Sequence, residues 1–220
     1  MMLKAVIFDM DGVIVDTEPG YKIATDEVLR EHGIITSDEY QDQFIGVTNE
    51  YMWGTIIREF HLPLTINQCV DMVNKKRAIM EERDGLHPLP GVIDLIKYFY
   101  DHGLSLAIAS SSPMSEINRV VDLFGIRKYF QAFITGTDCK ESKPHPEVFL
   151  RASSALDLKP EECLVIEDSK NGLLAANRAG MKSIGFANPA FGNQDLSSAT
   201  KVVAYFSQVT MEMCQTIMNK

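Results

Sequence analysis

Two aspartates, Asp9 and Asp11, have the clearest potential for chemistry in this chain. They follow residues 3–8, a run rich in strand-forming side chains that predicts a buried strand. The i, i+2 spacing lets both carboxylates project to one side before Gly12 releases the backbone. At about 4 Å and an effective dielectric constant of about 20, two such charges repel by roughly 4 kcal/mol. A cation, a shared proton or a polar ligand would relieve this repulsion, although an isolated Asp-x-Asp is most often a solvated turn.

Polar residues also follow three further apolar runs that are predicted to be strands. They are Ser110 and Ser111 after 104–109, Lys143 in the loop beyond 132–135, and Glu167 and Asp168 after 163–166. Each has an ordinary structural explanation: Ser112-Pro113 is a good helix start, a lone lysine is usually solvated, and acids suit the first turn of a helix. Ligands of an open parallel sheet bind outside the carboxyl ends of its strands, so we expect these side chains to meet there.

Together these residues predict a phosphoryl-transfer site. Carboxylate oxygens suit Mg²⁺, which keeps water ligands and bridges to phosphate. At its ordinary pKa of about 3.9, Asp9 would be ionised and could attack phosphorus to form an aspartyl phosphate. Asp11 would protonate the leaving oxygen and later take a proton from water, while Ser110 and Lys143 would hold the oxygens of the transferring group.

The surrounding pattern predicts an α/β fold interrupted by a helical insertion. Beyond residue 85, strands at 104–109, 132–135, 163–166, 183–186 and 202–205 alternate with helices at 113–124, 147–156 and 171–179. Nearly continuous apolar strands separated by helices indicate a parallel sheet with helices on both faces. Residues 18–84 lack convincing strands and read as a helical insert, and residues 85–91 are rich in Gly and Pro, as a hinge would be. We therefore expect a core of residues 1–17 and 85–220 and a second, helical domain at 18–84.

The composition of the chain limits the kinds of partner that it is expected to bind. The chain has 220 residues, a net charge of −9 and 45% hydrophobic residues, which suits a globular protein. Its acidity argues against nucleic acid or an anionic membrane as a partner. No apolar run reaches the ~18 residues of a membrane span, and no targeting segment is recognised. The four cysteines have no metal-site or redox spacing, so we expect a cytoplasmic protein with reduced thiols.

Four motifs in order resemble those of the haloacid dehalogenase-like (HAD) superfamily, and within it the β-phosphoglucomutase-like phosphatases with a helical cap. The motifs are residues 9–19, Ser110, Lys143-Pro144-x-Pro146, and Glu167 to Gly172. The resemblance implies a Rossmann-like core in which Asp9 is the nucleophile and Asp11 the general acid/base. It also implies Mg²⁺ bound by Asp9, the backbone carbonyl of Asp11, Glu167 and Asp168, with residues 18–84 as a cap over the substrate. Because such a cap moves without a partner, we expect a monomer.

Departures from the family pattern bear on the substrate. Gly20-Tyr21 stands where relatives commonly have a histidine, and Asn49 stands where the mutase has an arginine for the non-transferring phosphate. Pro113 and Met114 replace the Lys and Asn that follow the second motif of the mutase. Each loss removes a means of binding a sugar bisphosphate. The basic residues 75–77 could compensate, although a solvated helix face is the simpler interpretation.

We therefore predict a magnesium-dependent phosphatase that acts on a small phosphorylated metabolite, a sugar or polyol phosphate. A hexose-phosphate mutase of the β-phosphoglucomutase type is the alternative, and a receiver-like signalling module is a more distant one. The predicted phosphate and substrate contacts are Ser110, Ser111, Lys143, Thr17 and Asn49.

Overall fold

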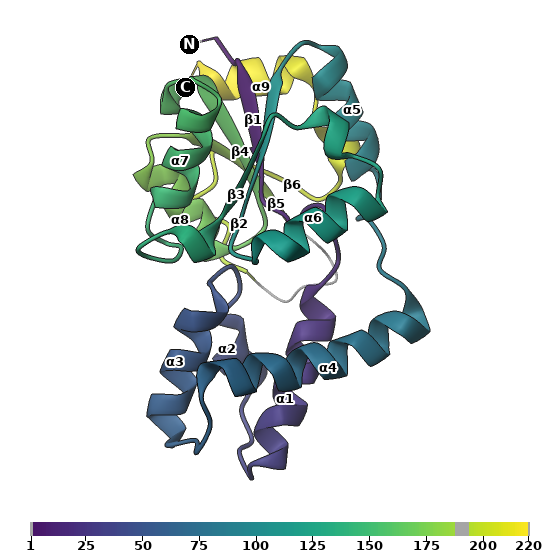
Figure 1. Ribbon diagram of the computed structural model, residues 1–220. Helices are drawn as coiled ribbons and strands as arrows, with labels where there is room; N and C mark the ends of the chain where they lie inside the picture. The colour runs from purple at the N-terminus through teal and green to yellow at the C-terminus, as the bar shows by residue number, and fades with distance from the viewer. Residues whose placement is uncertain (1, 188–193, 220) are drawn as a thin grey trace.

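The computed structural model describes residues 2–187 and 194–219 (Figure 1). Within these residues, six parallel strands form one sheet with the order β3-β2-β1-β4-β5-β6. The strands are β1 (Ala5–Phe8), β2 (Ser105–Ser110), β3 (Ala132–Thr135), β4 (Cys163–Glu167), β5 (Lys182–Phe186) and β6 (Lys201–Val203). The predicted Rossmann-like parallel sheet is confirmed.

Strand β1 is central and buried along its whole length. Its side chains alternate between two hydrophobic clusters: Val6 and Phe8 join one face of the sheet, and Ala5 and Ile7 join the other. Phe8 lies beside Ile108 of β2 and Ile166 of β4. The next residue of each strand therefore reaches the same edge of the sheet, which is where the polar side chains begin.

Helices cover both faces of the sheet. Buried side chains of α5, α6 and α9 pack against one face, and those of α7 and α8 pack against the other. The helices are α5 (Val92–Asp101), α6 (Met114–Leu123), α7 (Glu147–Ala155), α8 (Lys170–Arg178) and α9 (Met211–Met218). Short 3-10 turns lie at Arg127–Tyr129, Gly136–Asp138, Pro160–Glu162 and Phe206–Gln208.

Four further helices form a separate unit below the carboxyl edge of the sheet (Figure 1). They are α1 (Glu18–Glu31), α2 (Asp38–Asp42), α3 (Asn49–Phe60) and α4 (Ile66–Asp84). The hydroxyl groups of Ser37, Thr48 and Thr65 accept hydrogen bonds from the first turns of α2, α3 and α4, which explains where these helices begin. The unit has its own hydrophobic cluster, with Trp53 fully buried at its centre.

Two helices of the core and one helix start differ from the sequence-based expectations. Helices α5 and α9 were not predicted, although α5 buries four apolar side chains. The predicted start of α6, with Ser112 as N-cap and Pro113 as first helical residue, is wrong: Pro113 is the N-cap in an extended conformation, and the helix begins at Met114. The Ser112 hydroxyl group instead donates a hydrogen bond to the Asp11 carboxylate at the sheet edge.

None of the helices in the described ranges combines the length and the apolar character that crossing a bilayer requires. The four cysteines form no disulfide bond.

Replacing Trp53 by alanine should reduce the free energy of unfolding by about 3–5 kcal/mol, because it empties the centre of the helical unit. Denaturant unfolding followed by circular dichroism measures the loss. Tyr51→Ala is the matched control, since this aromatic side chain lies on the same helix but is 54% exposed. Equal losses in the two variants would contradict a tightly packed core around Trp53.

Candidate active site

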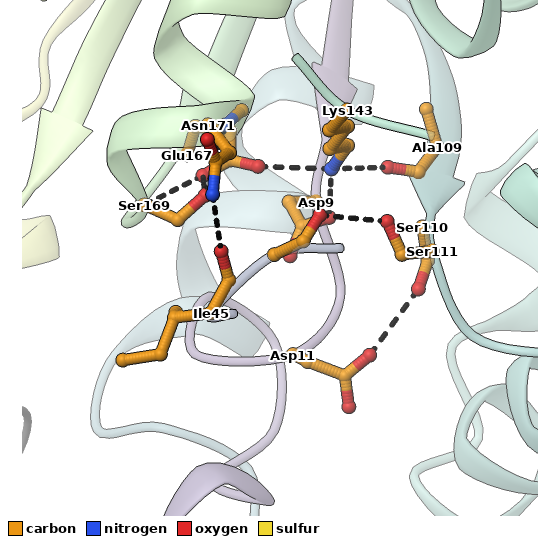
Figure 2. A network of polar contacts seen from close by, with 12 residues as sticks. Asp9, Asp11, Ile45, Ala109, Ser110, Ser111, Lys143, Glu167, Ser169 and Asn171 are labelled. Carbon is orange, nitrogen blue, oxygen red and sulfur yellow. Dashed lines mark hydrogen bonds and ion pairs between the residues drawn. The ribbon is translucent and has the colours of Figure 1, made fainter. Parts of the chain in front are cut away.

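Three strands deliver polar groups to one point at the carboxyl edge of the sheet (Figure 2). Asp9 follows β1, Ser110 ends β2, and Glu167 ends β4. All three side chains are buried. Since β1 lies between β2 and β4, the parallel register brings together residues that are far apart in the sequence.

Lys143 enters this acidic edge from the loop before α7. Its side chain is 1% exposed, and its Nζ lies 2.5 Å from Asp9 Oδ1 and 2.8 Å from Glu167 Oε1. It also donates to the backbone carbonyl of Ala109 at 3.4 Å (Figure 2). A single buried ammonium group thus links strands β1, β2 and β4.

The charged groups shift one another's pKa. Burial alone would lower the pKa of Lys143, but the Asp9 and Glu167 carboxylates outweigh it and hold that pKa above its ordinary value. Burial raises the pKa of Asp9 well above its ordinary value; Lys143 opposes this, whereas Glu167 and Asp11 add to it. The expectation that Asp9 has an ordinary pKa is therefore wrong, because the effect of burial on this pKa is larger than that of Lys143.

The donor set fits a divalent cation. Asp9, Glu167 and Asp168 are all buried, and one carboxylate oxygen from each lies within 4.8 Å of the others. One lysine cannot neutralise three carboxylates, and a hard dication with oxygen ligands would supply the missing charge. Asp11 does not contribute its side chain to this cluster.

Two glycines leave room for these carboxylates. A Cβ atom on Gly12, which has φ +80°, would overlap the Asp168 carboxylate, and one on Gly172 would overlap the Glu167 carboxylate. Glu167 is held further by Ser169, whose backbone N–H and hydroxyl group donate to Oε2 at 2.7 and 2.9 Å. The backbone of α8 and the loop after β1 are therefore shaped around the acids.

Asp11 points to a different set of partners. Its carboxylate accepts hydrogen bonds from the hydroxyl groups of Thr17 at 2.5 Å, Ser112 at 2.6 Å and Ser110 at 3.2 Å. Asp9 and Asp11, two residues apart, thus have different surroundings: one lies in a buried ionic cluster, and the other is half-buried among hydroxyl groups. This difference suits two separate roles in one reaction.

A cavity of about 360 Å³ lies between this edge and the helical unit. Asp9 and Asp11 line the cavity on the side of the sheet. Of the predicted phosphate and substrate contacts, Ser111 and Asn49 also line it. Thr17 reaches Asp11 rather than the cavity, while Ser110 and Lys143 lie beside the acids. Ser112, which the sequence interpretation treated as a helix cap, also lines the cavity.

The loop between α2 and α3 is attached to the sheet edge. The hydroxyl group of Ser111 donates to the Gly46 carbonyl at 2.8 Å, and Asn171 donates to the Ile45 carbonyl at 3.1 Å (Figure 2). The backbone N–H of Thr48 donates to the Ser142 hydroxyl at 2.9 Å. No local sequence pattern predicts the contacts of Asn171 and Ser142, because both depend on a loop about a hundred residues away.

The sequence favours a solvated helix face for the basic residues 75–77 of α4. In the structure these residues are not all exposed to solvent. Lys76 lies in ion pairs with Glu27 and Glu31, in a partly exposed position. Arg77 is 5% exposed, pairs with Glu81 at 3.0 Å and stacks over the Tyr21 ring at 3.6 Å. The ring at the position of the missing histidine thus supports a buried guanidinium group.

Replacing Lys143 by methionine should reduce the free energy of unfolding by about 3–5 kcal/mol, because it leaves two buried carboxylates without their counter-ion. Urea unfolding in chelator-containing buffer measures the loss. Lys97→Met, on an exposed position of α5, is the control and should change stability by less than about 0.5 kcal/mol. An unchanged stability of the Lys143 variant would show that the ionic cluster is not structurally required.

The parallel sheet, the inserted helices and the acidic edge place the protein in the class of Rossmann-like enzymes. Comparison with family models then specifies the family, since the model of the haloacid dehalogenase-like hydrolases matches residues 6–186. The chain belongs to this family, as its four motifs predicted.

The chain is similar to several named relatives. It is 32% identical to the phosphorylated carbohydrates phosphatase of Thermotoga maritima over 83% of this chain and 84% of the relative. It is 29% identical to hexitol phosphatase B of Escherichia coli K12 over 92% and 95%. The crystal structure of a β-phosphoglucomutase from Clostridium difficile matches with a TM-score of 0.83 at 28% identity, covering 99% of this chain and 98% of that one. The family match and the two phosphatases confirm the predicted enzyme class, a phosphatase-type hydrolase.

Proposed function

We propose that this protein is a magnesium-dependent phosphatase that hydrolyses a small sugar or polyol phosphate through an aspartyl phosphate on Asp9. The observation that carries this proposal is the position of Asp9. Its carboxylate belongs both to the buried acidic cluster and to the lining of the cavity. Asp11 lines the same cavity, so a bound phosphate ester could meet both groups.

The names of two relatives and the size of the cavity support the proposed substrate class. The phosphatase from Thermotoga maritima is named for phosphorylated carbohydrates and the one from Escherichia coli for hexitols. A cavity of about 360 Å³ lies within the size range of small-molecule sites. The substrate would place its phosphate at the sheet edge and its carbon chain against the helical unit.

The reaction proceeds in two displacements. A carboxylate oxygen of Asp9 attacks phosphorus, and the ester oxygen leaves as an alcohol with a proton from Asp11. Asp11 then takes a proton from a water molecule, whose oxygen attacks phosphorus, releasing phosphate and restoring the Asp9 carboxylate. Ser110 and Lys143 would hold oxygens of the transferring group.

The magnesium ligands would be Asp9, the backbone carbonyl of Asp11, Glu167 and Asp168. When bound, the ion neutralises charge on the carboxylates and on the transferring phosphoryl group. Such a charge would also oppose the rise in the pKa of Asp9, so that Asp9 remains an ionised nucleophile at neutral pH.

Residues 18–84 would act as a cap that closes over the substrate, with residues 1–17 and 85–220 as the catalytic core. The separate hydrophobic cluster of the helical unit supports this division. Side chains of the core hold the backbone of the loop containing Ile45 and Gly46 beside the acidic edge, where a cap would meet the substrate. A single chain holds all the residues of the proposed reaction, which supports a monomer as the active form.

The structural match to a β-phosphoglucomutase keeps a mutase as the second candidate. Asn49, which lines the cavity, lacks the charge that would hold the other phosphate of a sugar bisphosphate. Release of inorganic phosphate and isomer interconversion, each assayed with and without a bisphosphate activator, separate the two. Isomer turnover without net phosphate release would contradict the phosphatase. The family match favours either enzyme over a receiver-like module.

Asp9→Asn should reduce phosphate release by about a thousandfold or more, because an amide is a poor nucleophile. Asp11→Asn should lose roughly 10²- to 10⁴-fold through lost proton transfer. Phosphate release and circular dichroism are measured together. The control Asp157→Asn changes an exposed residue with φ 55°, a conformation that asparagine adopts readily, and should keep full activity. Substantial turnover by the folded Asp9 variant would refute its role as nucleophile.

Removing divalent cations with a chelator should abolish phosphate release, and added magnesium should restore it. Magnesium should also raise the melting temperature of the wild-type protein, because it binds only the folded acidic cluster. Asp168→Asn should weaken both responses, which a titration of magnesium in each assay measures. Full activity in the presence of excess chelator would contradict the metal requirement.

A further inference from the structure

A second group of charges lies in the helical part of the cavity. Lys22 of α1 has its Nζ 3.0 Å from Asp42 Oδ1 and 3.3 Å from Asp38 Oδ1, both of them on α2. All three residues line the same cavity as Asp9 and Asp11. This group, the Lys22–Asp38–Asp42 cluster, takes no part in the reaction described above.

The charge balance of this cluster is negative. Lys22 is the one basic side chain among the described residues that line the cavity, and two carboxylates already neutralise it. The Asp42 side chain is 27% exposed, so its interaction with Lys22 is only partly screened by solvent. A negative group on the substrate would have to displace a carboxylate from Lys22 and then remain beside it.

The rest of this lining can hold an uncharged, hydroxyl-bearing group. Gln41, Asn49 and Thr25 offer hydrogen-bonding side chains. Phe44, Val47 and Met52 offer apolar surface on which the C–H groups of a carbon chain can pack. Hydroxyl groups can also donate to Asp38 and Asp42, an interaction that an ionised carboxylate or a fully ionised second phosphate cannot make.

We propose that the Lys22–Asp38–Asp42 cluster selects the substrate by charge, admitting phosphate monoesters whose remaining part is uncharged and polyhydroxylated and disfavouring those with a second anionic group. This inference rests on the proposed phosphatase function and narrows its substrate class. Asp38 and Asp42 would repel a second anionic group on the substrate. Because both aspartates pair with Lys22, its ammonium group is not available to bind that anion.

A matched pair of substrates tests the inference. Sorbitol 6-phosphate and 6-phosphogluconate have the same six-carbon chain and differ at the far end, where one has a hydroxymethyl group and the other a carboxylate. The measured quantity is the ratio of kcat/KM for the sorbitol ester to that for the gluconate ester. A second measurement, of binding alone, is the ratio of the inhibition constants of the two esters against hydrolysis of p-nitrophenyl phosphate.

Two sets of substitutions should move this ratio in opposite directions. The double variant Asp38→Asn/Asp42→Asn releases Lys22 to pair with the carboxylate, and should lower the ratio about tenfold. Lys22→Met removes the cation and leaves both aspartates, and should raise it. Glu82→Gln is the control, because it removes one negative charge from the exposed surface of α4, outside the cavity, and should leave the ratio unchanged.

The wild-type protein should prefer the sorbitol ester by about tenfold or more. A wild-type ratio near one, a shift of the same sign in both sets of variants, or an unchanged ratio in both sets would overturn the inference. A merely structural cluster would affect both substrates alike and therefore leave the ratio unchanged. If the wild-type protein released phosphate from none of the three esters, the proposed function itself would fail. Hydrolysis of p-nitrophenyl phosphate without discrimination between the other two would overturn the charge selection alone.

Discussion

The ammonium group of Lys143, buried against Asp9 and Glu167, is the interaction on which the rest of the site depends. Without a counter-charge, adjacent carboxylates could not remain ionised when buried at the carboxyl edge of the sheet. The lysine reaches them because β1 lies between β2 and β4, so that their carboxyl ends meet at one point. One lysine still leaves an excess of negative charge, which makes the edge suited to a divalent cation and, with it, to a phosphoryl group.

The cavity extends this electrostatic arrangement into the helical unit. At the sheet, an ionic cluster lies beside Asp9, while the Asp11 carboxylate accepts hydrogen bonds from hydroxyl groups. At the opposite end, Lys22 is neutralised by two aspartates. The two ends therefore differ in what they can bind: one suits a phosphate with its cation, and the other an uncharged group. The net charge of −9 does not prevent the protein from binding a phosphate at one end and an uncharged group at the other, because its positive groups lie at these particular positions.

The sheet and its acidic edge were largely predictable, whereas the helices and the hydroxyl groups were less so. The apolar runs of β1 to β4 are short, continuous and bounded by charge, so their bounds and the residues after them could be recognised locally. Ser112 could not be assigned correctly, because a serine before proline is equally suitable as a cap, and only its distance to Asp11 shows its other use. Arg77 was expected in solvent, but Tyr21 and Glu81 surround it from elements that sequence spacing does not relate.

The sequence by itself determined the parallel sheet, the acidic pair after its first strand and the family of the enzyme. These depend on local hydrophobic patterns and on motifs whose residues are neighbours in the chain. Only the tertiary structure decided that the pKa of Asp9 is raised, that Asp11 is turned toward Thr17 and Ser112, and that Lys22 is neutralised within the cavity. Desolvation and pairing of charges depend on the distances between groups and on their burial, which exist only once distant segments have packed together.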